Sequence, residues 1–287
     1  MPRLRSRVNL MLRIASGLTA KSIGAFMNGT QSSVCDVAEK RALRSVFQMP
    51  GVAWLCPVML SGQTIASKAQ SQSTRRAVMD TLCNLSEDEY LTYLRAYYQA
   101  GEERFGTHWN YADLLTFLHA SAKLLKPRNY LEIGVRRGRS LSIVAQCCPN
   151  CSIFGFDLWM QNYAGMPNPG ADFVRDELAR GGFAGNLELV SGDSHQTLPD
   201  FFRDFPDIEF DMINVDGDHS EEGARLDLLQ VLPRLAIGGV LLLDDITHPQ
   251  HRYLELVWDE LVGNNEQFST AKYTDLGYGV AVAVRKS

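Results

Sequence analysis

The chain has 287 residues, of which 45% are hydrophobic and 21% are charged, and its formal net charge is −5. This composition is that of an ordinary soluble globular protein, long enough for one large core and an appendage. The excess of acids argues against binding to nucleic acid through bulk charge, and no apolar run approaches the roughly 20 residues of a membrane span.

Six cysteines in a chain of this length do not form a disulfide framework. Cys147, Cys148 and Cys151 lie close together in the sequence, at the end of a predicted helix. A structural zinc site takes four ligands, commonly from two such pairs, and no second pair follows. We therefore interpret these residues as reduced, partly buried thiols and expect a cytoplasmic protein.

The first 34 residues carry five basic side chains and no acid. Arg13 interrupts the apolar run that a signal peptide would need. We interpret this segment as a basic arm that packs on a partner subunit or stays mobile, with weak attraction to an anionic surface as the alternative. Residues 48–75 are rich in Pro, Gly, Ser and Gln and predict an irregular connection.

Helical patterns follow this connection. Residues 75–104 place apolar side chains at helical spacing, with a new N-cap expected at Ser86. A further helix is predicted over residues 111–125, and His119 on it is interpreted as a packed histidine rather than a ligand. We expect residues 1–108 to form an N-terminal arm and helical extension that supplies a lid or dimer contacts, and residues 109–287 to form the main domain.

From residue 129 onward strand and helix patterns alternate, which is typical of parallel strands joined by helical crossovers. The predicted strands are residues 130–133, 152–156, 187–190, 210–215 and 240–243. A helix over residues 222–235 is expected to turn Leu228, Leu229, Leu232 and Leu235 towards the sheet. Residues 268–273 and 278–284 predict two more strands, which must pair antiparallel because their link is too short to cross over. The predicted fold class is α/β, a Rossmann-like doubly wound, mostly parallel seven-stranded sheet with an antiparallel C-terminal hairpin.

The stretch YLEIGVRRGRS (residues 130–140) predicts a strand, a tight glycine turn and the start of a helix. Gly134 lets the backbone approach a ligand, and Gly138 can take a torsion that side chains disfavour. Ser140 lies where the free N–H groups of a helix attract negative groups. A carboxylate on a buried strand is costly, so Glu132 is expected to meet a positive group or a set of backbone donors.

An acid stands at or just after the carboxyl end of each of the five parallel strands. These acids are Glu132, Asp157, Asp193, Asp216 with Asp218, and Asp244 with Asp245. Because ligands of open α/β sheets bind outside these ends, we expect the acids to line one crevice. The turn is not a good dinucleotide fingerprint, because Arg136, Arg137 and Arg139 fill a loop that must be tight for a pyrophosphate. The acidic crevice would also repel phosphates. It favours a cationic nucleoside without phosphate, such as S-adenosylmethionine.

Four stretches carry a resemblance to a known family. They are YLEIGVRRGRS, FGFDLW (residues 154–159), GDS (residues 192–194) and the block FDMINVDGDHSEEGARLDLLQVLPRLAIGGVLLLDDI (residues 210–246). They resemble the class I S-adenosylmethionine-dependent methyltransferases, and more narrowly the branch that holds the macrocin-type sugar O-methyltransferases and the cephalosporin-hydroxylase-like proteins. The resemblance covers roughly residues 110–285.

The resemblance implies a set of cofactor contacts. They are Glu132, Gly134, Gly138, Ser140, Asp157, Leu158, Asp193, Ser194 and Asp216. The first four would line the methionine and ribose part of the cofactor. Asp157 would bind the ribose diol, and Asp193 with Ser194 would lie against the adenine.

The resemblance also implies a divalent metal held by Asp216, Asp244 and Asp245. Three carboxylates brought together repel unless they are protonated or bridged by a hard cation, and Mg²⁺ suits such ligands. The metal would hold an acceptor hydroxyl and lower its pKa. Two residues are candidates for the base: Asp218, which matches the base of the sugar enzymes, and His219, whose ordinary pKa near 6.5 suits proton removal at neutral pH.

These features predict an O-methyltransferase that acts on a hydroxyl of a small molecule, such as a sugar or a natural product. We expect no nucleic-acid partner, and an N-terminal region that can support a homo-oligomer. The alternatives are a non-catalytic S-adenosylmethionine-binding or scaffold protein of the same fold and, with less support, a nicotinamide-dependent oxidoreductase. Glu221 stands where the family commonly has tyrosine, which leaves the polarity of the acceptor pocket open.

A long loop is expected over the site at residues 160–170, which are rich in Gly and Pro. Trp159, Tyr163 and Met166 would either touch the ligand or pack the loop. His248 and His251 are interpreted either as further site residues or as surface-loop histidines.

Overall fold

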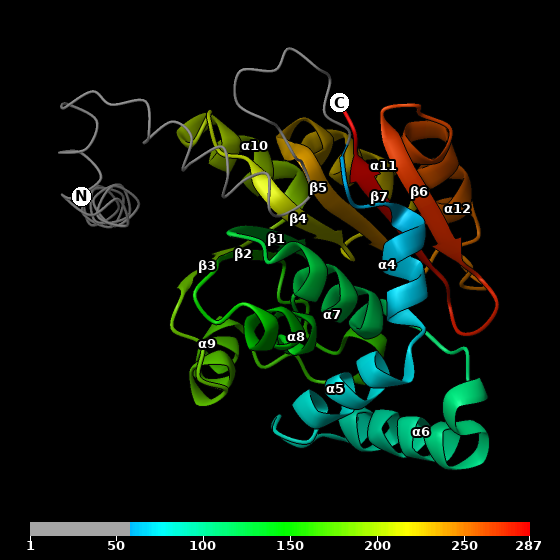
Figure 1. Cartoon of the computed structure of the whole chain (residues 1–287). Coiled ribbons are helices and arrows are strands. Elements are labelled where there is room, and N and C mark those ends of the chain that lie inside the picture. Colours follow the sequence, from blue (N-terminus) through cyan, green and yellow to red (C-terminus); the bar gives the residue numbers. More distant parts are fainter. Residues whose placement is uncertain (1–57) are drawn as a thin grey trace, which may run out of the picture. The chain divides into compact units, whose positions relative to one another are not determined.

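The computed structural model describes residues 58–287 (Figure 1). The predicted basic arm and the first part of the predicted connection lie outside the described residues. Within them, seven strands form a single sheet in the order β3-β2-β1-β4-β5-β7-β6. The strands are β1 (Asn129–Ile133), β2 (Ser152–Asp157), β3 (Asn186–Ser191), β4 (Phe210–Val215), β5 (Leu235–Asp244), β6 (Phe268–Tyr273) and β7 (Val280–Arg285).

The first five strands run parallel, and β7 pairs antiparallel with both β5 and β6. The predicted fold class is therefore confirmed. The strand order reverses between β1 and β4, which places the ligand-binding crevice of such a sheet at the carboxyl ends of these two strands.

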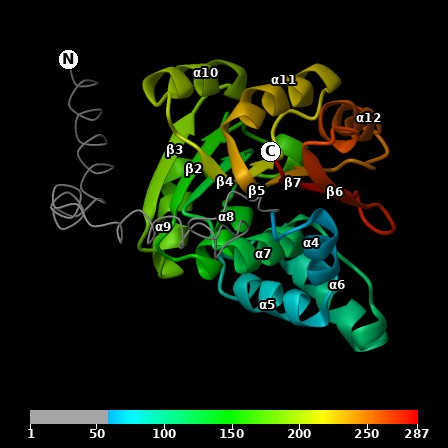
Figure 2. The same cartoon turned by 45° about the horizontal axis from the view of Figure 1, so that its top comes forward.

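Helices cover both faces of the sheet (Figure 2). One face carries α4 (Gly62–Ala69), α5 (Gln72–Leu82), α6 (Glu89–Phe105), α7 (Leu114–Leu125), α8 (Arg139–Cys147) and α9 (Ala171–Arg180). The other carries α10 (Ser194–Asp204), α11 (Glu221–Val231) and α12 (Tyr253–Trp258). Short helical turns complete the chain at η1 (Gly106–His108), η2 (Tyr163–Gly165), η3 (Leu232–Arg234) and η4 (Asp259–Gly263).

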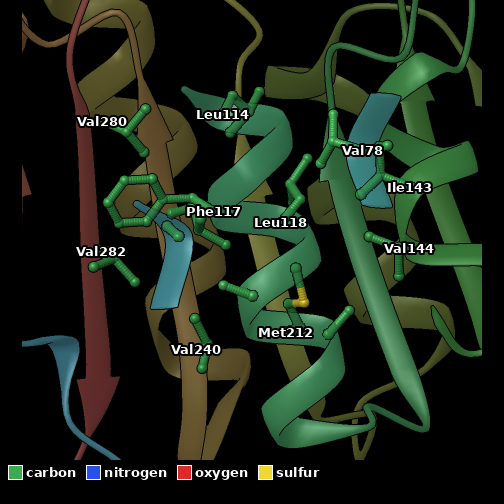
Figure 3. Packing of buried hydrophobic residues seen from close by; sticks show 14 of the residues in the cluster. Val78, Leu114, Phe117, Leu118, Ile143, Val144, Met212, Val240, Val280 and Val282 are labelled. Carbon is green, nitrogen blue, oxygen red and sulfur yellow. The ribbon is translucent and has the colours of Figure 1, made fainter. Parts of the chain in front are cut away.

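The core between α7 and the sheet shows how the spacing of apolar residues in the sequence decides which side chains pack together. Phe117 and Leu118 of α7 are fully buried and belong to one cluster with Val240 of β5 and Val282 of β7, and Phe117 points towards β7 (Figure 3). Each such side chain contributes roughly 1.5–3 kcal/mol by leaving water. Because side chains alternate along a strand, Tyr130 joins this cluster, whereas Leu131 and Ile133 join the cluster on the opposite face.

The predicted irregular connection is wrong over the residues that form α4 and α5. The serines that suggested a loop are helix caps instead. The hydroxyl of Ser61 accepts from the Thr64 N–H at 3.1 Å, and that of Ser71 accepts from the Thr74 N–H at 3.3 Å. A serine oxygen at this position satisfies one of the free N–H groups of the first helical turn.

The N-cap of α6 was predicted two residues too early. Asp88, rather than Ser86, caps the helix, because its carboxylate accepts from the Leu91 N–H at 2.9 Å. The Ser86 N–H donates instead to the Glu177 carboxylate at 2.7 Å. This contact ties the start of α6 to α9.

The crossover into β5 also differs from the prediction. The helix ends at Val231 and β5 begins at Leu235, where the sequence pattern predicted the strand from residue 240. Leu229 is 49% exposed, because the buried stripe of α11 passes through Leu228 and Val231. The pairing of β5 with β4 shifts register at its start, which lets the strand continue through Gly238 and Gly239.

The remaining predicted elements are confirmed within a few residues, including the predicted helix that becomes α7 and the C-terminal hairpin. The helices before residue 108 share a hydrophobic cluster with α7 and α8. In the part of the chain that the structure describes, no helix is both long and apolar enough to cross a bilayer.

Candidate active site

The glycine turn after β1 brings two strand ends into contact. Gly134 has a φ of 88°, and a Cβ on it would lie 1.8 Å from the carbonyl oxygen of Asp216. The Asp216 N–H donates to the Ile133 carbonyl at 2.9 Å. Only glycine allows this approach of β1 and β4. Gly138, with a φ of 72°, then caps α8.

Glu132 lies beneath this turn and is fully buried. It accepts from the Ser140 hydroxyl at 2.5 Å, from the Tyr130 hydroxyl, and from the Asn214 amide at 3.5 Å. The expectation of a positive group or backbone donors was therefore wrong. Because its partners are neutral, burial prevails and raises the pKa of Glu132 to about 8.

Tyr130 and Asn214 were not singled out from the sequence. Tyr130 precedes Glu132 by two residues on the same strand and so faces the same side. Asn214 stands opposite Glu132 in the pairing of β1 with β4. A polar residue in an otherwise apolar strand was the only available signal. The Asn214 Oδ1 atom is buried and has no partner among the described residues.

Asp157, at the end of β2, organises the glycine turn. One of its carboxylate oxygens accepts from the N–H groups of Val135 at 2.8 Å and Arg136 at 2.6 Å. Among residues 58–287, the other accepts from the Trp159 N–H alone. Since a carboxylate oxygen has two lone pairs, this second oxygen can still accept from a ribose hydroxyl. Leu158 beside it is 57% exposed.

Asp193 and Ser194 begin α10. The Asp193 carboxylate accepts from the His195 N–H at 3.0 Å, and its side chain is 45% exposed. The Ser194 hydroxyl points inward and donates to Asp227 at 2.8 Å. Asp227 is a fully buried residue of α11 that sequence reasoning missed, and burial raises its pKa to about 6. It holds the predicted adenine loop against the neighbouring helix.

The acids of β4 and β5 meet at one point. The His219 Nε2 atom lies 3.2 Å from Asp216 Oδ1 and 3.9 Å from Asp245 Oδ2. Asp245 has a φ of 58°, a strained backbone of the kind found at functional sites. The structure therefore brings together three of the predicted site residues.

Crowding of like charges shifts the titration of this group. Burial and the carboxylates of Asp216 and Asp245 raise the pKa of Asp244 well above its usual range. Burial and Asp216 raise the pKa of Asp245 to about 6. Burial alone would lower the pKa of His219, but the carboxylates of Asp216, Asp245 and Asp218 outweigh it and raise that pKa.

The negative charge of these crowded carboxylates suits a bound cation, but the positions of the side chains do not form a ready metal site. The donors are the hard oxygen ligands that Mg²⁺ prefers. Among residues 58–287, however, no group of three or more His, Cys, Asp or Glu side chains is arranged to hold a metal ion.

Asp218 makes its contacts at the start of α11. Its carboxylate accepts from the Ser220 N–H at 2.8 Å, and its side chain covers Gly223 in the first turn of α11. An exposed acid at a helix N-terminus stabilises that helix. The two candidate bases therefore have different surroundings.

The loop after β2 reaches the same group. The Tyr163 hydroxyl lies 3.1 Å from His219 Nδ1. Trp159 donates from Nε1 to the Ser191 hydroxyl at 2.8 Å and packs against the core, which favours the packing interpretation for this residue. His248 and His251 also lie nearby: their rings stack at 4.8 Å, and the ring of His251 lies 5.4 Å from that of His219.

Two arginines of the glycine turn, Arg137 and Arg139, have partners at the start of α6. Arg137 Nε lies 2.7 Å from the Asp88 carboxylate, and Arg139 pairs with the same carboxylate and lies 5.1 Å from the ring of Tyr90. Asp88 thus caps α6 and ties it to the turn. Sequence reasoning missed this contact because the residues are far apart in the chain.

Comparison with known proteins agrees with this geometry. Residues 131–246 match a family model described as a methyltransferase domain. The chain carries a methyltransferase domain. The glycine turn, the acid after β2 and the seven-stranded sheet agree with this match, which supports an S-adenosylmethionine-dependent methyltransferase.

Several solved structures are similar to this chain at low sequence identity. A protein from Klebsiella pneumoniae, provisionally assigned as an O-methyltransferase, is 17% identical over 77% of this chain and 100% of its own, with a TM-score of 0.50. The O-methyltransferase TomG from Streptomyces achromogenes, involved in tomaymycin synthesis and solved with S-adenosylmethionine, is 21% identical over 71% of this chain and 92% of its own, with a TM-score of 0.49. An O-methyltransferase from Bacillus cereus in complex with S-adenosylhomocysteine is 17% identical over 78% of this chain and 96% of its own, with a TM-score of 0.49. No curated protein matches the chain.

Proposed function

We propose that this methyltransferase acts on a hydroxyl group of a small molecule, such as a sugar or a natural product, with His219 as the base. The contact of His219 with Asp216 and Asp245 beside the glycine turn carries this proposal. S-Adenosylmethionine, when bound, supplies an electrophilic methyl group. The remaining chemistry is removal of the hydroxyl proton and alignment of the oxygen with that methyl group.

The hydrogen bonds of His219 suit proton removal. If Nε2 carries the proton that Asp216 accepts, Nδ1 is the basic nitrogen. The Tyr163 hydroxyl, 3.1 Å from Nδ1, marks a place where a hydroxyl can donate to this nitrogen. The proton of the acceptor would pass to Nδ1, and the neighbouring carboxylates would stabilise the imidazolium that forms.

The predicted cofactor contacts support the same arrangement. The turn at Gly134 leaves no room for a Cβ, and Asp157 keeps acceptor capacity for a ribose hydroxyl. Asp193 and Ser194 begin the next helix along the sheet edge. Each of these contacts is part of the proposal.

A divalent metal held by Asp216, Asp244 and Asp245 also belongs to the proposal. It would supply Lewis acidity towards the acceptor hydroxyl. Support comes from the crowding of these carboxylates, which a hard cation would relieve. Binding of Mn²⁺, followed by paramagnetic resonance, should be tight in the wild-type protein and lost in Asp244→Asn. Equal binding by both proteins would remove the metal from the mechanism.

The activity is tested with labelled S-adenosylmethionine and a panel of hydroxylated acceptors, with Mg²⁺ or with a chelator. We expect His219→Asn to lower kcat by about 10²–10⁴-fold while cofactor affinity, followed by calorimetry, stays unchanged. Asp218→Asn is the matched control and should retain most activity.

Three results would count against the proposal. Failure of the wild-type protein to bind S-adenosylmethionine would overturn the cofactor assignment. Binding without transfer to any hydroxylated acceptor would favour the non-catalytic alternative. Full activity of His219→Asn would assign the base elsewhere.

Location and assembly complete the proposal. We infer a cytoplasmic protein, which is supported by the lack of a disulfide among Cys83, Cys147, Cys148 and Cys151. An oligomer formed through residues 1–108 stays a prediction that sedimentation of the full chain tests.

A further inference from the structure

Arg136 differs from its neighbours in the glycine turn. Its Nε and Nη2 atoms are buried, and neither makes a hydrogen bond with any residue that the structure describes. Arg137 and Arg139, by contrast, pair with Asp88. A charged donor removed from water without an acceptor costs several kcal/mol. Two buried guanidinium nitrogens without an acceptor beside a ligand-binding turn therefore indicate a missing anionic partner.

The backbone at Arg136 is also unusual. Its φ is 52°, in the left-handed region that side chains rarely adopt. Its N–H donates to Asp157 at 2.6 Å, which fixes the residue against the end of β2. Strain of this kind persists where the surrounding structure imposes it and is common at ligand sites.

The protein groups around the guanidinium do not replace that partner. The guanidinium lies over the ring of Tyr163, 5.7 Å from its centre, and the Tyr163 hydroxyl contacts His219. An aromatic face compensates a cation by only about 0.5–2 kcal/mol and accepts no strong hydrogen bond. Tyr163 thus connects Arg136 to the group formed by His219 and Asp216.

The chemistry of the cofactor identifies the partner. Its methionine end carries an ammonium and a carboxylate. The carboxylate of Asp216 at this edge suits the ammonium and would repel the carboxylate of the cofactor. The guanidinium offers a planar fork of donors that matches a carboxylate. We propose that Arg136 binds the methionine carboxylate of S-adenosylmethionine, an inference that rests on the proposed cofactor site.

Two ligands that differ only in this group test the proposal. S-Adenosylmethionine and its decarboxylated analogue are titrated by calorimetry into the wild-type protein and into Arg136→Gln. We expect Arg136→Gln to weaken the binding of S-adenosylmethionine by about 10- to 100-fold, which is the loss typical of a charge-assisted pair. Binding of the decarboxylated analogue should change by less than about twofold, because it lacks the group that Arg136 would hold.

Two further variants keep the test decisive. Arg136→Lys retains the charge but not the fork of donors, so it should lose part of the affinity for S-adenosylmethionine alone. Arg137→Gln removes an arginine of the same turn that is paired with Asp88, and it should not distinguish the two ligands. Thermal unfolding of each variant checks that the domain is folded.

The outcomes separate this inference from the cofactor assignment. Equal weakening of both ligands by Arg136→Gln, or no weakening of either, overturns the role of Arg136 while the cofactor site stands. Unchanged cofactor binding with selective loss of acidic acceptors would assign the guanidinium to the acceptor instead. Failure of the wild-type protein to bind S-adenosylmethionine overturns both.

Discussion

Replacing Glu132 by glutamine should change how the stability of the domain depends on pH. Glu132 is fully buried, and burial raises its pKa to about 8 from an ordinary value of 4.5. The folded state therefore holds a proton that the unfolded chain releases between these two pH values. Stability from this group is fully present below pH 4.5 and is lost as the pH rises through 8.

The magnitude follows from these two pKa values. One pKa unit corresponds to about 1.4 kcal/mol, so Glu132 should destabilise the fold by on the order of 3 kcal/mol at pH 7 relative to acid conditions. The cost should approach about 5 kcal/mol above pH 8. Glutamine has a similar shape but does not ionise. Its amide can still exchange hydrogen bonds with the hydroxyls of Tyr130 and Ser140.

The assay is urea unfolding of both proteins between pH 5 and pH 9, without cofactor. We expect similar free energies of unfolding at pH 5 and a growing advantage of Glu132→Gln as the pH rises. Glu266→Gln, at an exposed loop position before β6, is the matched control and should run parallel to the wild type. A difference that does not vary with pH, or one that favours the wild type at pH 9, would refute the reasoning.

Three further changes test the packing of the site and core. Gly134→Ala should lower the free energy of unfolding in a urea titration by about 2–4 kcal/mol, because the new Cβ would meet the Asp216 carbonyl. The control Gly182→Ala, at a φ of 82° and with no atom within 4 Å of its Cβ, should lose only about 1 kcal/mol. Equal losses would contradict the close approach of β1 and β4. Asp88→Asn keeps a helix cap but removes the charge that holds two arginines of the glycine turn. The free energy of unfolding should therefore fall by about 1–2 kcal/mol and depend less on salt than in the wild type. An unchanged midpoint of urea unfolding at low salt would show that the pairs contribute nothing. Phe117→Ala should cost about 3–5 kcal/mol in thermal unfolding, since a fully buried ring leaves a cavity, and a loss below 1 kcal/mol would contradict the packing of α7.

The elements of the sheet could be predicted because their signals are local. The alternation of strand and helix patterns, the glycines at residues 134 and 138, and the acids after each parallel strand all lie within short stretches of chain. Parallel strands joined by crossovers point their carboxyl ends in one direction. That rule predicted that the acids after β4 and β5 would lie close together, and the structure places Asp216 and Asp245 at 3.2 Å and 3.9 Å from the same histidine, His219.

The errors arose where partners are distant in sequence. Arg139 pairs with Asp88, 51 residues earlier, and Tyr163 meets His219, 56 residues later. No local pattern encodes such contacts. For the same reason, the composition of residues 62–75 suggested a loop, although its serines cap two helices.

The sequence by itself determined the fold class, the ligand-binding edge of the sheet and the residue types along it. Only the tertiary structure decided what each side chain meets: neutral hydroxyls around Glu132, Asp88 beside two of the arginines, and no acceptor for the buried nitrogens of Arg136 among the described residues. The physical reason is that backbone periodicity is set by neighbours in the chain. The charge state and availability of a buried group depend on whatever the fold packs against it.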